Sequence, residues 1–384
     1  MKRPLSLFLA ASSVALAAGP AFTARRPHYG GTLVVEEAAK LSSLDAPGNA
    51  AEARLKAQIE SLIYDRAGRN DTSTEPGAFR LAQWEPGKDA VLAANEGYKD
   101  GRPFVDSVEI RMGRPAGDRM MDLELGKADV AEIPVEQARR AAEGGARISA
   151  SRPDQLISIV FEGTSATTGD ARIREALARS IDRAAIVNFI LQKQGEPAGG
   201  LLPQWSSGTA FLFSTAADPS RAKEIVAQIG PSPKLRLGYD SGDPLLQAIG
   251  ERIAVNARAA GMAVTPEAVA GGGRPGSGAW LTRMDMPSAE PGAALSYFLE
   301  QLKPIVARNE DREPLADPAT PEQIYEREAA VAGSYSVIPI AWAPHVYGVS
   351  ARVRDWSAPE PGKPLPLADI WLDQMDNTPG KKNR

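Results

Sequence analysis

Apolar residues recur at helical spacing along the stretch Asp170–Leu191. Ile173, Leu177 and Ile181 follow one another at intervals of four residues, which places them on one face of a helix. Charged side chains fall mostly between them, as a face exposed to solvent requires. Asp182 then stands where an N-cap would restart the helix, and a second apolar stripe follows it. The stretch therefore predicts two consecutive amphipathic helices.

The rest of the chain alternates between β-branched runs and helically spaced apolar residues. The runs predict strands at Gly30–Val35, Ser107–Met112, Leu156–Phe161, Leu235–Tyr239, Gly261–Val269 and Val337–Trp342. The helical spacing predicts helices at Ala50–Ile63, Asp118–Leu125, Val135–Ala142, Arg221–Ile229, Pro244–Ala260, Gly292–Leu302 and Pro321–Ala332. Leu156–Phe161 is apolar except for Ser158, which predicts a strand buried on both faces. The alternation favours a parallel sheet in the second half of the chain.

The first 24 residues have the order of regions found in a secretory signal peptide. Lys2 and Arg3 precede an uncharged run rich in Leu and Ala from Leu5 to Ala18, and small residues follow up to Ala24. The run is too short to span a membrane, which requires about 20 apolar residues. The sequence therefore predicts export to the periplasm, with residues 1–24 removed. No later segment is apolar enough to span a bilayer, so we expect a soluble mature protein.

Length and composition narrow the choice of function. A chain of 384 residues is long for a single core and suggests two lobes. The net charge of -4, without a long basic block, argues against a nucleic-acid partner. The absence of cysteine excludes disulfides, thiolate metal sites and a lipidated cysteine at the export junction. His28 and His345 are the only histidines, which excludes a site with many imidazole ligands.

Some stretches have a distinctive order of residues, beyond the apolar spacing that predicts a helix or a strand. Residues 172–187 read R-I-R-E-A-L-A-R-S-I-D-R-A-A-I-V, and Leu92–Arg111 reads L-A-A-N-E-G-Y-K-D-G-R-P-F-V-D-S-V-E-I-R. Gly30–Val35 followed by Leu41–Pro47 reads G-G-T-L-V-V and L-S-S-L-D-A-P. These stretches resemble the family 5 extracellular solute-binding proteins, which are the dipeptide, oligopeptide and nickel receptors of ABC importers. The resemblance touches nearly every segment between Gly30 and Trp371, but Tyr64–Pro76 is a short polar linker where the family carries an extra lobe.

The resemblance implies a periplasmic-binding-protein-like α/β fold of type II, with two lobes joined by a hinge. Lobe one is expected to comprise residues 28–161 and 343–384, and lobe two residues 162–342. The strands Leu156–Phe161 and Val337–Trp342 are the expected crossings between the lobes. Such a receptor, expected as a monomer, captures a small-molecule or peptide ligand, closes, and delivers it to an ABC transporter permease and ATPase complex. No cofactor or metal is expected, and no bond is made or broken.

Two other functions remain open at this point. An exported hydrolase would need a nucleophile, a base and an orienting group, and two distant histidines offer no such set. A degenerate receptor or scaffold would keep the lobes but no longer transport. Only a ligand-binding measurement separates this second alternative from a transport receptor.

Candidate ligand-binding residues come from the resemblance and from aromatic side chains. The resemblance places Glu37 and Ala38 at the cleft, after the first strand. Aromatic groups suit a small organic ligand because they offer large contact areas at low entropic cost, and the candidates are Trp205, Trp280, Trp342 and Tyr347.

A second pair of candidates lies where peptide-binding members have a W-x-x-D-like anchor for the α-amino group. Arg283 and Asp285 occupy that region, but the spacing from Trp280 differs and Arg283 adds an opposite charge. We therefore expect weak binding of short peptides or similar zwitterions, with Trp280 contributing more than Asp285.

Other motifs have simpler explanations. Gly271–Gly276 matches G-x-G-x-x-G but contains Pro275 and no helical pattern, so a flexible loop is expected rather than a nucleotide site. Ser220 and Lys223 spell S-x-x-K without the companion motifs of an acyltransferase, and Ser220 is expected to cap a helix. The adjacent carboxylates Glu36 and Glu37, and the pair Asp106 and Glu109, are expected on solvated faces.

Overall fold

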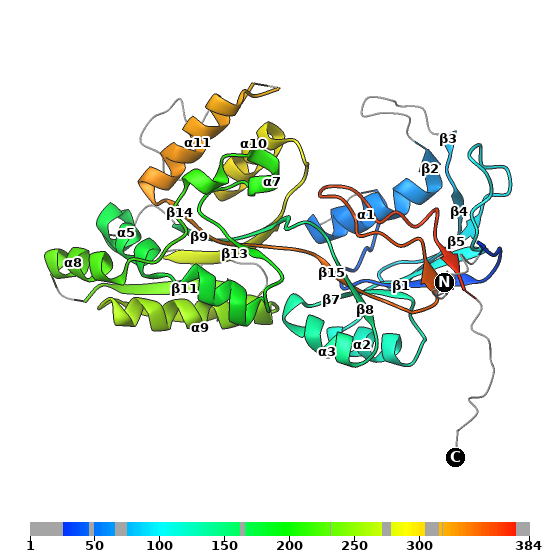
Figure 1. Cartoon of the computed structure of the whole chain (residues 1–384), viewed down its shortest axis with the longest axis horizontal. Coiled ribbons are helices and arrows are strands. Elements are labelled where there is room, and N and C mark those ends of the chain that lie inside the picture. Colours follow the sequence, from blue (N-terminus) through cyan, green and yellow to red (C-terminus); the bar gives the residue numbers. More distant parts are fainter. Residues whose placement is uncertain are drawn as a thin grey trace, which may run out of the picture.

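The computed structural model describes residues 26–45, 50–65, 75–161, 166–230, 232–270, 278–303, 315–316 and 318–373. The expected signal peptide (residues 1–24), the glycine-rich loop (271–276), most of the linker (66–74) and the C-terminal tail lie outside the described residues. Figure 1 shows two lobes side by side, each built around its own sheet.

The first lobe contains a seven-stranded sheet in the order β4-β5-β6-β1-β7-β15-β8. Its strands are β1 (Thr32–Glu36), β4 (Phe79–Glu85), β5 (Asp89–Ala94), β6 (Ser107–Arg111), β7 (Val130–Ile133), β8 (Arg147–Ala150) and β15 (Val346–Val349). Strand β1 is parallel to β6 and β7, and the remaining pairs are antiparallel. Two small sheets complete the lobe: β2 (Tyr64–Asp65) with β3 (Glu75–Pro76), and β16 (Val353–Arg354) with β17 (Trp371–Leu372).

The second lobe contains a six-stranded sheet in the order β10-β14-β9-β13-β11-β12. Its strands are β9 (Gln155–Phe161), β10 (Glu196–Pro197), β11 (Lys234–Asp240), β12 (Ala263–Val269), β13 (Ala279–Asp285) and β14 (Val337–Ala343). The parallel sheet expected here is found only for β11 with β12 and β13. The expectation was wrong for the other half, because β9 pairs antiparallel with both β13 and β14. The chain enters β9 from the first lobe and leaves β14 for the first lobe, so local alternation of helix and strand does not set their direction.

Most helices match the positions expected from their apolar spacing. In the first lobe they are α1 (Ala50–Ile63), α2 (Ala116–Glu124), η1 (Val135–Gln137) and α3 (Ala138–Glu143). In the second lobe they are α4 (Ala166–Gly169), α5 (Ala171–Ser180), α6 (Arg183–Ala185), η2 (Ile186–Ile190), α7 (Gln204–Ser207), η3 (Ala210–Leu212), α8 (Pro219–Ile229), α9 (Pro244–Ala259), α10 (Pro291–Leu302) and α11 (Pro321–Ser334). The two helices expected in Asp170–Leu191 are present, and Asp182 accepts a hydrogen bond from the Ala185 N–H, 2.9 Å, as the restarting cap. Helix α8 is capped by Asp218 rather than by Ser220.

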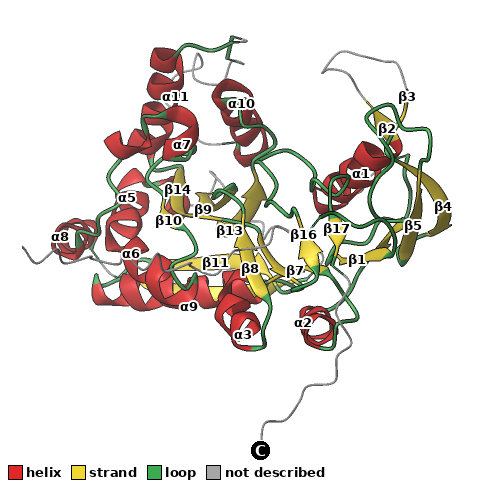
Figure 2. Ribbon diagram, turned by 45° about the vertical axis from the view of Figure 1, so that its right-hand side comes forward, coloured by secondary structure: helices red, strands yellow, loops and turns green. Residues whose placement is uncertain are grey.

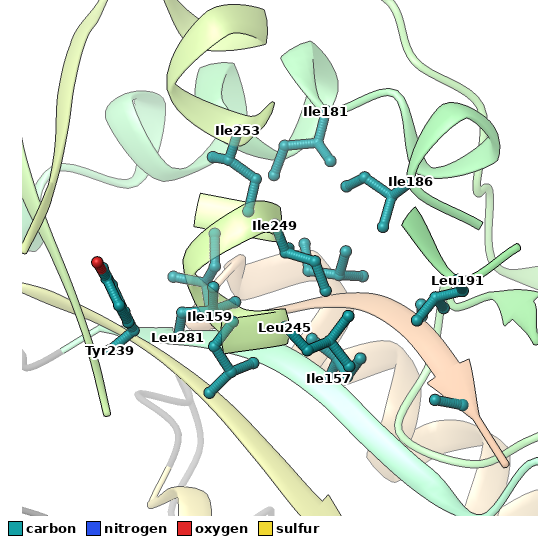
Figure 3. Close-up of a cluster of buried hydrophobic side chains, with 14 of the residues drawn as sticks. Ile157, Ile159, Ile181, Ile186, Leu191, Tyr239, Leu245, Ile249, Ile253 and Leu281 are labelled. Carbon is teal, nitrogen blue, oxygen red and sulfur yellow. The ribbon is translucent and has the colours of Figure 1, made fainter. Parts of the chain in front are cut away.

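Strand β9 is buried along its whole length, as its mainly apolar sequence predicts. All seven of its residues are buried, and alternate side chains reach opposite faces of the sheet. Ile157 and Ile159 pack with α9 on one face, where Ile249 and Leu245 meet them (Figure 3). Leu156 and Val160 join the cluster on the other face, and α10 and α11 cover that face (Figure 2).

The chain passes between the lobes at residues 151–154 and 344–345. Strands β9 and β14 both belong to the second sheet, so the first passage lies before the expected border at Phe161. The two connecting segments are bonded to each other: the Ser151 N–H donates to the His345 carbonyl, 2.9 Å, and the Asp154 N–H to the Ala343 carbonyl, 3.0 Å. Residues beyond β15 return to the first lobe, as expected, and pack into its core. Across the described residues, none of the helices has the length and apolar character needed to cross a membrane.

Candidate functional site

Two cavities lie where the lobes meet, and four side chains line both of them. The smaller cavity measures about 320 Å³ and the larger about 580 Å³. Arg54 from α1 and His345 from the second connection line both cavities. Asp285 at the end of β13 and Tyr297 on α10 do the same from the second lobe. The junction therefore brings together groups from segments far apart in the chain.

His345 joins carboxylates of the two lobes. Its Nδ1 atom lies 3.0 Å from Glu132 Oε1 on β7, and its Nε2 atom lies 3.4 Å from Asp285 Oδ1 on β13. Only 6% of the histidine side chain is exposed. Arg54 completes the cluster, because its Nη2 donates to both carboxylate oxygens of Glu132 at 3.1 Å. We call these four residues the junction cluster.

The charges of the junction cluster follow from its geometry. Burial and the neighbouring Arg54 lower the pKa of His345, but hydrogen bonds to Asp285 and Glu132 more than offset them and raise this pKa to about 9. Burial opposes ionisation of Glu132, yet Arg54 and His345 hold its pKa well below the usual range. The pKa of Asp285 is likewise lowered, because His345 and Arg54 outweigh the effect of burial. At neutral pH the cluster is thus an ionised network of two cations and two anions.

Two further carboxyls beside the cluster have raised pKa values. Burial and then the charge of Glu132 raise the pKa of Glu37 to about 7. Burial raises the pKa of Asp154, on the first connecting segment, to about 6. Both side chains line the smaller cavity. Near neutral pH they can therefore either donate or accept a hydrogen bond from a ligand.

Five of the eight residues expected at the ligand site lie on the cavity walls. Glu37 and Tyr347 line the smaller cavity, and Ala38 and Arg283 line the larger cavity. Asp285 lines both cavities. Arg283 does not oppose Asp285 as expected from their proximity in sequence. It pairs instead with Asp243, the N-cap of α9, 2.8 Å away.

The three tryptophans line neither of these two cavities. Trp280 and Trp342 are only 7% and 1% exposed. Trp342 packs edge-on against Phe298 of α10, with ring centroids 5.8 Å apart. Trp205 donates from Nε1 to the carbonyl oxygen of Pro153, 2.9 Å, so it braces the first connecting segment. Trp280 and Trp342 thus fill the second lobe instead of lining these cavities.

The expectation that Glu36 and Glu37 lie on a solvated face was wrong. Glu36 is fully buried and Glu37 is 6% exposed, because β1 is a central strand of its sheet. Burial raises the pKa of Glu36 to about 6, although Arg114 and Arg111 lie within 3.6 Å. Glu109, also expected without a charge partner, pairs with Arg111 at 2.7 Å.

Sequence reasoning missed Arg54, Glu132, Tyr297 and His345. Arg54 and Tyr297 sit on helices whose pattern gives no sign of which turn meets the other lobe. His345 did carry a signal, since it follows the apolar strand that was expected to cross between the lobes. Among the described residues no group of three metal-ligating side chains is placed to hold a metal ion.

The fold and the junction together define a class of protein. Two α/β lobes, joined by two connections and meeting around cavities lined by charged side chains, have the architecture of a periplasmic binding protein. A sequence profile of the bacterial extracellular solute-binding proteins, family 5, matches residues 42–294. The chain belongs to this family, which confirms the resemblance drawn from its motifs.

Solved structures show the same fold. The oligopeptide-binding protein AppA from Bacillus subtilis, in complex with a nonapeptide, superposes with a TM-score of 0.63 at 12% identity, covering 91% of this chain and 100% of that one. A putative peptide binding protein AppA from Clostridium difficile superposes with a TM-score of 0.66 at 16% identity, covering 78% of this chain and 67% of that one. NikA from Staphylococcus aureus, in complex with Ni(L-His)2, superposes with a TM-score of 0.58 at 16% identity, covering 81% of this chain and 72% of that one. These neighbours are binding proteins rather than enzymes.

Curated relatives match over shorter stretches. Protein XP55 of Streptomyces lividans is 28% identical over 214 residues, which is 51% of this chain and 40% of that protein. The probable D,D-dipeptide-binding periplasmic protein DdpA of Escherichia coli (strain K12) is 26% identical over 174 residues, 44% of this chain and 33% of that protein. The matched region thus spans less than half the length of these relatives.

Proposed function

We propose that this chain is the periplasmic solute-binding component of an ABC importer. It captures a small, peptide-like ligand between its lobes and delivers it to a membrane permease driven by an ATPase. The observation that carries the proposal is the junction cluster, because side chains of both lobes line both cavities there. A ligand that contacts them stabilises one arrangement of the lobes, and a permease recognises that arrangement. Names of relatives that bind dipeptides and oligopeptides support a peptide-like ligand.

The cluster suits a ligand with a positively charged amino group. Within the described part of the chain, the hydrogen bonds to Asp285 reach Oδ1, from Gln155 Nε2 at 2.7 Å and from His345 Nε2. Oδ2 has no such partner, and 29% of the side chain is exposed. An ammonium group at Oδ2 would make a charge-assisted hydrogen bond of roughly 1.5–3 kcal/mol. Asp285 therefore replaces Trp280 as the residue expected to contribute most to affinity.

Calorimetric titration with a dipeptide and tripeptide library tests the proposal. We expect Asp285→Asn to weaken the best ligand about tenfold or more, whereas Trp280→Phe leaves its affinity nearly unchanged. Circular dichroism of each variant checks that it folds. If no peptide gives heat with the wild-type protein, the chain is better described as a receptor or scaffold that no longer transports.

Export is part of the proposed function and has its own test. The order of a basic start, an apolar run and small residues in residues 1–24 supports removal of a signal peptide. N-terminal sequencing of the soluble protein from its native cells should start between Ala18 and His28. A soluble form that retains Met1 would contradict export.

A further inference from the structure

The guanidinium of Arg119, on α2, is buried without a complete set of partners. Arg119 is 5% exposed, and within the described part of the structure its Nε and Nη1 atoms have no hydrogen-bond acceptor. Among the described residues, the one carboxylate within 4.0 Å is that of Glu132, whose Oε2 lies 3.9 Å from Nη1. Glu132 already accepts hydrogen bonds from Arg54 and contacts His345. A buried charge that lacks hydrogen bonds is costly, so an external acceptor would stabilise Arg119 considerably.

The start of α2 offers further donors in the same place. The helix begins after Pro115, which provides no side-chain cap. Among the described residues, the backbone N–H groups of Ala116, Gly117 and Asp118 have no acceptor. Unbonded N–H groups and the helix dipole favour an anion at the first turn of a helix.

Both features open onto the larger cavity. Arg114, Pro115, Ala116 and Arg119 line this cavity of about 580 Å³, together with Asp285 from the opposite lobe. Arg114 donates to Asp122 at 2.7 Å, but its buried Nε atom has no acceptor among the described residues. The cavity therefore has one wall with unused donors and an acidic group across from it.

The neighbouring charges select the kind of anion. Glu132, Glu37 and Glu36 all act electrostatically on Arg119. A dianionic phosphate would meet more repulsion from these carboxyls than a singly charged group would. A carboxylate is planar and matches the fork of donors on a guanidinium.

We propose that Arg119 and the first turn of α2 form a carboxylate-binding subsite in the larger cavity. The inference rests on the proposed function in that it takes this cavity as the ligand site. A ligand whose carboxylate lies at Arg119 and whose amino group lies at Asp285 contacts both lobes at once. The substrate class is thus a zwitterion with a free carboxylate, such as an unmodified short peptide.

The experiment compares trialanine with trialanine amide by calorimetry. For the wild-type protein, the amide should bind about tenfold more weakly or worse, because it cannot accept charge-assisted bonds from Arg119. Arg119→Gln should bind the two peptides equally, Arg119→Lys should restore part of the preference, and Arg221→Gln, an exposed arginine on α8, should behave as wild type. If trialanine and its amide bind the wild type equally, or Arg119→Gln keeps the preference, the subsite is wrong while peptide binding stands.

A second measurement decides the case in which neither peptide binds. Succinate and succinamide are then compared by thermal denaturation of the same proteins. The subsite is supported if succinate raises the melting temperature, succinamide does not, and the rise requires Arg119. Peptide capture would then remain unsupported. No effect of succinate on the wild type would overturn the subsite. The wild-type comparison decides alone if Arg119→Gln does not fold.

Discussion

At the scale of single residues, His345 contributes strongly to the way the stability of the protein depends on pH. Its side chain has carboxylates on both ring nitrogens, and hydrogen bonds to them raise its pKa to about 9 despite burial and Arg54. The unfolded value is about 6.5. The folded state therefore holds the proton more tightly, and this stabilisation is fully present below pH 6.5. It is lost as the pH rises through about 9.

We expect the wild-type free energy of unfolding to fall on the order of 3 kcal/mol between pH 6.5 and 9 through this group. His345→Gln should show a much flatter profile in that window. The pKa values of Glu37 and Asp154 are raised to about 7 and 6. Their contributions to the stability of the protein are also lost as the pH rises, but mainly below this window. Urea unfolding at several pH values measures the slope.

The other histidine provides the matched control for this measurement. His28 is exposed, packs near Trp371 and lies outside the junction cluster. His28→Gln should keep the wild-type slope. Equal slopes for wild type and His345→Gln would show that the bridge between Glu132 and Asp285 does not depend on a protonated imidazole.

The identity of a residue alone gave wrong predictions where the role of its side chain depends on burial. Arg174 and Arg183 look like members of a solvated helix face, yet both are 5% exposed and donate to backbone carbonyl groups. Trp280 and Trp342 look like ligand platforms and fill the second lobe. A side chain's chemistry is visible in the sequence, but its surroundings come from segments that are distant along the chain.

At the scale of elements, the connecting segments between the lobes are the feature that bears on function. They are hydrogen-bonded to each other. The backbone carbonyl oxygen of Asp154 also accepts a hydrogen bond, 2.7 Å, from the Met286 N–H just after β13. Apolar residues of both lobes, including Val135 and Leu245, belong to one continuous core cluster on the side of α3. For the receptor function proposed above, we expect closure by rotation about these connections, which would change the cavities.

We expect a verified peptide ligand to reduce the radius of gyration measured by X-ray scattering, because it contacts both lobes at the junction. Asp285→Asn at the same ligand concentration should keep the profile of the free protein. An unchanged profile at saturation of the wild type would contradict closure around the ligand.

Other elements could be predicted because their signals are local. Asp182 caps a helix as its position indicated, since a cap needs only the next three residues. Strand β14 was predicted despite Pro339, which lies where the pairing with β9 shifts register. Because proline has no backbone N–H to donate to the ladder, this irregular point of the strand tolerates it, and its carbonyl oxygen accepts a bond from Arg183.

At the scale of the whole molecule, the sequence by itself determined the class of fold, the family and most helices and strands. Hydrophobic periodicity reports which face of an element is buried, and family motifs report turns and caps, so neither needs long-range information. The tertiary structure decided the antiparallel pairing of β9, the passage between lobes at residues 151–154, and the junction cluster. Arg54, Glu132, Asp285 and His345 come from four separate elements, and no spacing along the chain relates them. Their charges depend on mutual distances and burial, which exist only once both lobes are folded against each other.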